Sequence, residues 1–234
     1  MPVTAGLAAP SVFAGTANVI AVGVLLAEFG MFRQALLRDQ VRLYAAQSVL
    51  ISALSAVVAA ARHLPELYAL AGLSFALKAV VVPLVLRRLL RGLGVRGTGP
   101  GWTDIAGTGS LSLASTVLVA IAVAAFGIFS VAALGIRSAV LPPAALSVSV
   151  GVVLVALVLM IIRRDVASQA IGLFSLENGV SLTSLVVAAG LPLILEIIFL
   201  FDLLVAVVVV GLLIRVHHGS ARSLSTADLT RLRG

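Results

Sequence analysis

The sequence predicts an all-α integral membrane protein with about seven transmembrane helices. Of its 234 residues, 61% are hydrophobic and 11% are charged, and the mean hydropathy is +1.22. Soluble domains carry roughly 25% charged residues, so this chain has too little charge to cover the surface of one. Its apolar stretches are also longer and more uniform than the alternating segments of about ten residues that build a membrane β-barrel. Membrane-spanning helices are the architecture that fits these observations.

Seven stretches are long enough for a membrane helix, which needs about 20 apolar residues. They lie near residues 11–32, 43–61, 64–86, 111–136, 144–162, 166–190 and 192–214. We interpret the first stretch as a helix of the mature protein, because no Lys or Arg precedes it and it is too long for a signal peptide. Pro192 follows a very tight turn between the last two helices, since proline is tolerated at the first position of a helix.

The linkers and the basic residues predict the domain organisation and the orientation. A Gly- and Arg-rich loop at 87–110 separates three helices in 1–86 from four helices in 111–215, and 216–234 form a tail. With the N-terminus outside, 13 of the 16 Lys and Arg residues lie on the inner side. The positive-inside rule therefore predicts a cytoplasmic C-terminus. The net charge of +7 is mainly a topology signal, and we expect no nucleic-acid partner, because no basic run lies on a soluble domain.

Two parts of the chain have a similar order of features, which suggests an internal repeat. An Arg-Asp pair opens the second span at Arg38 and the sixth span at Arg164, and Pro65 and Pro192 start the helices that follow. Helices 1–3 and 5–7 would then be parallel repeats, with the fourth helix as a spacer, as is common in transport folds. The alternative is a purely compositional similarity, because apolar sequences resemble each other easily.

Four ionisable residues deep within the predicted spans are the candidates for proton transfer. They are Lys78, Glu177, Glu196 and Asp202. Charge at mid-membrane is costly, so such residues normally face the bundle interior or a water path. Glu177 shares a helix face with Ser181 at i+4, and Asn178 adds polarity beside it. This patch could hold a water or pass a proton, although serine and asparagine also join membrane helices without a further role.

Lys78 is too far from the inner end of the third span for easy snorkelling, so we expect a functional or charge-pairing role. Ser74 lies one turn before it, and Pro83 should disturb the helix and free a carbonyl that water could reach. Asp202 lies near the middle of the last helix and needs a partner. The candidates are Glu177 or a base from another helix or subunit.

Other charged residues lie nearer the ends of the spans. Glu196 lies one turn inside the outer end of the last helix and, six positions before Asp202, faces another direction. It is either the exit of a path or a solvated interface residue. We expect Glu28 to join Asp39 and the neighbouring arginines in an interfacial charge cluster.

Without cysteine and with only three histidines, we expect no metal or cofactor. No catalytic motif is present, so this chain is not expected to be an enzyme on its own.

The last third of the chain resembles component E of the hydrogenase-4 type formate hydrogenlyase complexes. The resemblance lies in IGLFSLENGVSLTSLVVAAGLPLILEIIFLFDLLVAVVVVGLLIRVHHG, which contains Glu177-Asn178-Gly179, then Glu196 and, six residues on, Asp202. The tail SLSTADLTRLRG, the segment YAAQS that begins at Tyr44, and FALKAVVVPLVL fit the same family. The resemblance therefore touches nearly the whole chain and is most specific near the C-terminus.

This resemblance implies a multi-pass subunit in the plasma membrane of a prokaryote, within a group 4 [NiFe] hydrogenase or a related respiratory complex. Its implied partners are antiporter-like and other membrane subunits, peripheral redox subunits and membrane lipid. The last three helices are similar to the K subunit of bacterial complex I and the C subunit of multisubunit cation/proton antiporters, where two helices each carry a glutamate. Asp202 aligns with the second glutamate. The first falls at Phe174, and Glu177 lies one turn later, about 4.5 Å along the helix.

The resulting expectation is a membrane-arm subunit of an energy-converting redox complex. Its buried acids would contribute to proton translocation, and the subunit would link the redox arm to antiporter-like subunits. Two alternatives stay open. The protein could be a purely structural membrane spacer, or it could be a transporter or a subunit of a cation/proton antiporter complex.

Overall fold

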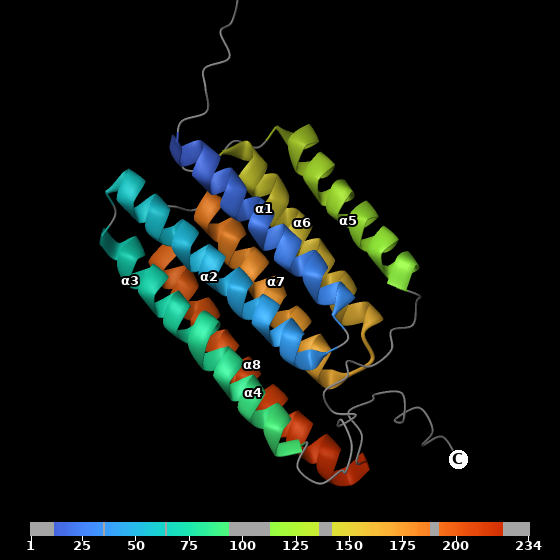
Figure 1. Ribbon diagram of the computed structural model, residues 1–234. Coiled ribbons are helices and arrows are strands. Elements are labelled where there is room, and N and C mark those ends of the chain that lie inside the picture. The colour runs from blue at the N-terminus through green and yellow to red at the C-terminus, as the bar shows by residue number, and fades with distance from the viewer. Residues whose placement is uncertain are drawn as a thin grey trace, which may run out of the picture.

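The computed structural model describes residues 12–34, 36–63, 65–93, 113–135, 142–187 and 192–221, and these ranges are helical throughout except for a few connecting residues. The elements are α1 (Val12–Arg33), α2 (Leu37–Arg62), α3 (Pro65–Ser74), the π-helix η1 (Phe75–Val81), α4 (Val82–Leu93), α5 (Leu113–Leu134), α6 (Pro143–Ile162), α7 (Val166–Val187) and α8 (Pro192–Ala221). Helices α3, η1 and α4 form one continuous rod (Figure 1). Each of the seven predicted spans corresponds to one rod, and the expected all-α fold is confirmed for the described residues.

Five of these helices are long and apolar enough to cross a membrane. Among the described residues these are Phe13–Arg33, Leu37–Ala61, Pro65–Leu90, Ala114–Leu134 and Ala144–Ile162. Helix α8 contains a shorter apolar stretch, Phe201–Leu213. These helices indicate a multi-pass membrane protein, as the sequence predicts.

Two rods continue past the C-terminal ends predicted for their spans, and α2 begins at Leu37, before its predicted start near residue 43. Helix α4 continues to Leu93 and α8 to Ala221, whereas the sequence suggests that the spans end near residues 86 and 214. The first part of the predicted Gly- and Arg-rich loop is therefore helical. Residues 94–112 and 222–234, which include the rest of that loop and most of the predicted tail, lie outside the described residues.

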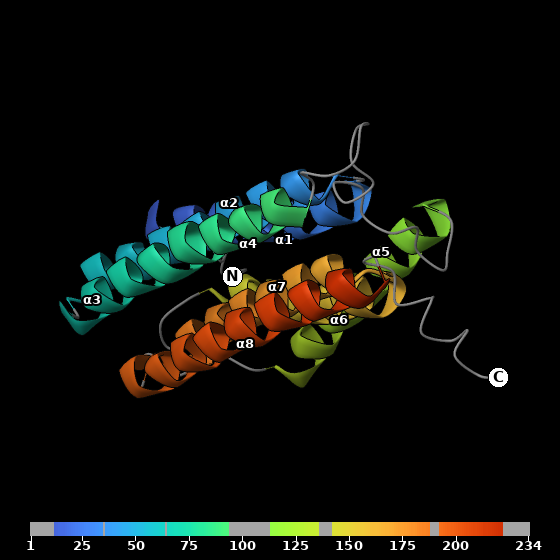
Figure 2. The same cartoon turned by 90° about the horizontal axis from the view of Figure 1, so that it is seen from below.

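The helices form two layers, and α7 lies in the middle of one of them. Seen from below, α1, α2 and the α3–η1–α4 rod form one layer, and α6, α7 and α8 form the other (Figure 2). Across the layers, α1 contacts α6, α2 contacts α7, and α3 and α4 contact α8. Helix α5 packs outside these layers against α6 and α1. Helix α7 is therefore enclosed by α6 and α8 in its own layer and by α2 opposite.

Glycines bring α7 very close to α6. A Cβ atom at Gly172 would lie 2.7 Å from Cγ of Met160, and one at Gly179 would lie 2.8 Å from Cγ2 of Val153 and 3.0 Å from its backbone nitrogen. Small residues at a crossing let membrane helices approach so closely. On this side the polar contact between the two helices is the hydrogen bond of 3.0 Å from Thr183 to Ser149, and Ser175, Asn178 and Ser181 of α7 contact α1, α2 and η1 instead.

The π-helix η1 provides the local disturbance that the sequence predicts around Pro83. The N–H of Val82 donates to the carbonyl of Leu77, five residues earlier. Proline has no N–H, and its ring clashes with the carbonyl four residues before it. A wider π turn before Pro83 relieves this clash without breaking the rod. Lys78 lies at the centre of this turn.

Candidate functional site

Lys78 and Glu177 form an ion pair in the interior of the helix bundle. Nζ of Lys78 lies 3.6 Å from Oε1 of Glu177 and donates a hydrogen bond of 2.6 Å to Oγ of Ser181. The Lys78 side chain is 1% exposed and that of Glu177 is 14% exposed. The contacts join η1 of one layer to α7 of the other. Since an unpaired charge in such a position costs several kcal/mol, each of the two side chains depends on its partner.

Further hydroxyl groups line the neighbourhood of this pair. Ser74, one turn before Lys78, is buried, and its Oγ has no hydrogen-bond partner among the described residues. The same holds for Oγ of Ser184, one turn beyond Ser181 on α7. Buried hydroxyls of this kind are typical binding points for internal water. The structure thus brings together Lys78, Glu177 and Ser181 of the predicted site, and Ser74 lies buried one turn before Lys78 on the same rod.

A second polar cluster surrounds Glu28, and here the sequence-based expectation is wrong. Glu28 is 0% exposed and lies between α1, α2 and α7, away from the interfacial charges. Nε2 of Gln47 donates to its Oε2 at 2.7 Å, and the hydroxyl of Ser175 donates to the same oxygen. Glu28 shares a helix face with the buried residues Val24 and Met31, and this face is turned inward.

Asn178 belongs to this second cluster. Its Nδ2 donates to Oε1 of Gln47 at 3.1 Å and to Oγ of Ser48 at 2.9 Å. Neighbouring residues of an α-helix point about 100° apart. Helix α7 therefore directs Glu177 toward η1 and Asn178 toward α2. The two clusters thus lie on different sides of α7. The sequence-based prediction treats Glu177 and Asn178 as members of one polar patch.

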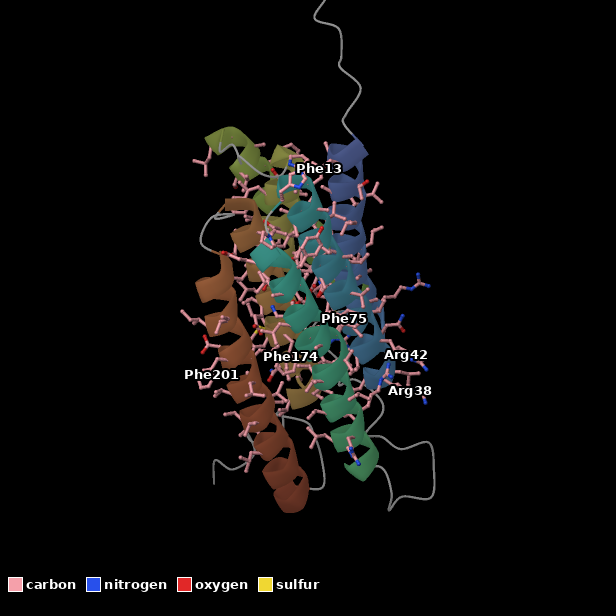
Figure 3. All side chains as sticks on the ribbon, turned by 90° about the vertical axis from the view of Figure 1, so that its left-hand side faces the viewer. Phe13, Arg38, Arg42, Phe75, Phe174 and Phe201 are labelled. Atoms are coloured by element: carbon pink, nitrogen blue, oxygen red, sulfur yellow. The ribbon has the colours of Figure 1, made fainter. Side chains whose placement is uncertain are left out.

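Asp202 does not meet Glu177. It is exposed on α8 and makes no hydrogen bond or ion pair with any described residue. Helix α8 packs on the bundle through Leu203 and Val207, so the preceding position faces outward. Phe201, beside Asp202, points away from the bundle in Figure 3. Of the partners proposed for Asp202, Glu177 is therefore excluded, and no base among the described residues contacts it. The side chain of Glu196 lies outside the described residues.

The charged ends of the helices have structural contacts of their own. Arg42 pairs with Asp39 at 2.8 Å on the surface of α2, where Arg38 and Arg42 point outward in Figure 3. Arg163 donates to the carbonyls of Phe32 at 2.8 Å and Gln34 at 3.2 Å, at the end of α1. Burial lowers the pKa of this guanidinium. The predicted cluster of interfacial charges around Asp39 is therefore present, but Glu28 is not part of it.

Sequence reasoning missed Glu28, Gln47, Ser48 and Ser175 as members of a site. Two pairs of polar residues, each spaced seven residues apart, are a sequence feature that indicates some of these members. Gln40 and Gln47 are seven residues apart on α2, and Ser168 and Ser175 are seven apart on α7. The structure pairs them, because Oγ of Ser168 donates to Oε1 of Gln40 at 3.0 Å and Oγ of Ser175 lies 2.9 Å from Oε1 of Gln47. Polar residues with the same seven-residue spacing on two apolar helices therefore indicate that α2 and α7 contact each other through these residues.

Comparison with known proteins identifies one related sequence. Over 90 residues the chain is 40% identical to the uncharacterized protein Rv0085 of Mycobacterium tuberculosis. The match covers 38% of this chain and 39% of the mycobacterial protein, so the chain spans well under half the length of that relative. No family model matches the chain, and no solved structure matches it.

Proposed function

We propose that this protein is a membrane-arm subunit of an energy-converting redox complex of the hydrogenase-4 or complex I type, and that it takes part in proton translocation. The observation that carries the proposal is the ion pair of Lys78 and Glu177 between the two helix layers. Ionisable residues inside a membrane mark ion and proton paths, and π turns occur frequently at functional sites. Lys78 and Glu177 also lie in the segments that resemble hydrogenase-4 component E.

The pair can couple the binding of a proton to the position of a charge. The partners of the Lys78 ammonium include the carboxylate of Glu177 and the hydroxyl of Ser181. When Glu177 takes up a proton, its attraction for Lys78 falls and the bond to Ser181 becomes the stronger one. When Glu177 loses the proton, the ion pair forms again. Charge rearrangement driven by the redox arm would act on this equilibrium, and the two groups would titrate as a unit.

We further propose an outside N-terminus, a cytoplasmic C-terminus and a parallel repeat of helices α1 to α4 and α6 to α8. In Figure 1, α1, the α3–η1–α4 rod, α6 and α8 run down the page, and α2, α5 and α7 run up. Each helix of the first group contacts its counterpart in the second, and α5 lies outside both groups. This arrangement supports the repeat, the distribution of basic residues supports the orientation, and the mycobacterial relative supports a prokaryotic plasma membrane.

The outer face of α8 is the proposed contact with an antiporter-like subunit. Its exposed side chains include Ile198, Phe201, Val205 and Leu212, with Asp202 among them. A carboxylate facing lipid is costly, so Asp202 needs a basic or hydrogen-bonding group from the neighbouring subunit. Contacts on this face would link the subunit to the rest of the membrane arm.

The test combines capture of the complex with proton-translocation measurements. The tagged protein should co-purify with peripheral redox subunits and antiporter-like subunits. Glu177→Gln should assemble normally on a native gel and should lower proton translocation about tenfold or more. Glu66→Gln, the same chemical change at an exposed position at the start of α3, is the matched control and should leave translocation unchanged.

Two results would favour the other functions. Normal translocation by a fully assembled Glu177→Gln complex would point to a structural spacer. Capture of cation/proton antiporter subunits without any redox partner would point to an antiporter complex.

A further inference from the structure

The Glu28 cluster is a buried carboxyl site in which the hydrogen-bond partners among the described residues, Gln47 and Ser175, are neutral. Gln47 and Ser175 hold Oε2 of Glu28, whereas its other oxygen, Oε1, is buried without a hydrogen-bond partner among the described residues. None of the ion pairs between described residues includes Glu28. An ionised carboxylate would therefore be buried without an opposite charge in contact, at a cost of several kcal/mol.

The helices around Glu28 offer little charge to offset this cost. Helices α5 and α6 contain no charged residue, and the charged residues of α2 lie near its two ends. Tyr44 on α2 and Glu177 on α7 are the titratable groups nearest the cluster in sequence, and Glu177 is paired with Lys78. Arg163, just beyond α6, binds the carbonyls at the end of α1. A neutral carboxylic acid avoids the cost of an unpaired buried charge.

A count of hydrogen-bond donors leads to the same result. The hydroxyl of Ser175 carries one proton but has two acceptors within reach, Oε2 of Glu28 and Oε1 of Gln47. If Glu28 is protonated, its O–H donates to Oγ of Ser175, and the hydroxyl of Ser175 donates to Gln47. The amide of Gln47 donates back to Oε2 of Glu28. This closes a ring of three hydrogen bonds in which each donor has an acceptor.

We propose that Glu28 is a second proton-binding site of this protein, in which Ser175 and Gln47 hold the carboxyl in its protonated form. The site is distinct from the Lys78–Glu177 pair, because it joins α7 to α1 and α2 instead of to η1 and contains no base. It does not depend on the proposed redox complex, since its ligand is a proton and its residues all come from this chain.

A sodium ion is the competing ligand, because it also prefers carboxylate, amide and hydroxyl oxygens. The geometry favours the proton. The group that Gln47 directs at Glu28 is its Nε2, a hydrogen-bond donor that would repel a cation. Ser175 also contacts Glu28 directly, and this contact leaves no space for an ion between them.

Infrared spectroscopy of the purified full-length protein tests the proposal. We expect a carbonyl stretch of a protonated carboxylic acid that shifts to lower frequency in D2O, is absent in Glu28→Gln and persists in Glu177→Gln. Ser175→Ala keeps Glu28 but removes its hydroxyl partner, so the band should move to higher frequency. This second variant keeps the test informative if Glu28→Gln does not fold.

Three results would overturn the proposal. One is a spectrum in which Glu28→Gln removes a carboxylate band instead of a carboxylic acid band. Another is a carboxylic acid band that does not move in Ser175→Ala. The third is a band that is lost in sodium chloride but retained in potassium chloride at equal concentration, which would assign the site to sodium. Because the isolated protein is measured, none of these results depends on proton translocation by a complex.

Discussion

Helices α7 and α8 are neighbours in one layer, and each carries a carboxylate in its apolar part, yet the two carboxylates lie in opposite surroundings. Glu177 on α7 is 14% exposed and paired with Lys78. Asp202 on α8 is exposed and makes no contact with a charged or hydrogen-bonding group of the described residues. The described residues thus supply an opposite charge for the carboxylate of α7, whereas none of them supplies one for the carboxylate of α8. This difference is the basis of our proposals that Glu177 takes part in proton transfer and that the face of α8 around Asp202 contacts another subunit.

The largest expected effect comes from breaking the pair on the α7 side. Lys78→Met keeps the length of the side chain but leaves Glu177 without its opposite charge. Loss of one member of a buried pair costs about 3–5 kcal/mol, and we expect somewhat less here because Glu177 retains some exposure. The Tm of the purified protein in detergent measures this loss.

The double variant Lys78→Met, Glu177→Gln completes the comparison. If the pair is real, the second change should recover part of the Tm lost by the first, with a coupling energy of about 1–3 kcal/mol. Additive losses would mean that the two side chains do not interact.

The next largest effect concerns the packing that holds α7 in place. Gly179→Ala adds a methyl group that would lie 2.8 Å from Cγ2 of Val153 and 3.0 Å from its backbone nitrogen. Overpacking of this kind costs about 1–3 kcal/mol. Gly72→Ala on α3 is the matched control, because a Cβ there meets no atom within 4 Å. A lower Tm for Gly179→Ala than for Gly72→Ala is expected, and equal values would contradict the close contact of α6 and α7.

A smaller effect is expected from the hydroxyl beside the pair. Ser181→Ala removes the hydrogen bond to Nζ of Lys78 but leaves the ion pair intact. A hydrogen bond to a charged group contributes about 1.5–3 kcal/mol at most, and Glu177 can compensate for part of it. Thermal unfolding of Ser181→Ala and of Ser181→Thr, which keeps a hydroxyl, distinguishes loss of the bond from a change in packing.

The smallest effect on the isolated protein is expected at Asp202. Asp202→Asn removes a charge that contacts no described residue of this chain, so the Tm should stay unchanged. The assembled complex should nevertheless lose subunits on a native gel, because the proposed partner group loses its opposite charge. A large drop in the Tm of Asp202→Asn together with normal assembly would contradict the proposal, because it would mean that Asp202 stabilises this chain and not its contact with a partner.

The seven helices and the polar side chains within them could be predicted from the sequence, since apolar length and helical spacing are local properties. The disturbance before Pro83 was also predictable, because proline acts on its own turn. Which helix a polar face meets depends on the packing of distant segments. The sequence therefore predicts a surface position for Glu28, which is buried, and allows Glu177 as a partner of Asp202, which is exposed.

The central claim is that the Lys78–Glu177 pair takes part in proton translocation, and the number of protons moved per electron transferred tests it most directly. This ratio can be measured for the purified complex in closed vesicles, with Glu66→Gln as the control. The account predicts that Glu177→Gln lowers the ratio below that of the wild-type and control complexes while the complex stays assembled. An assembled Glu177→Gln complex with the wild-type ratio would contradict it.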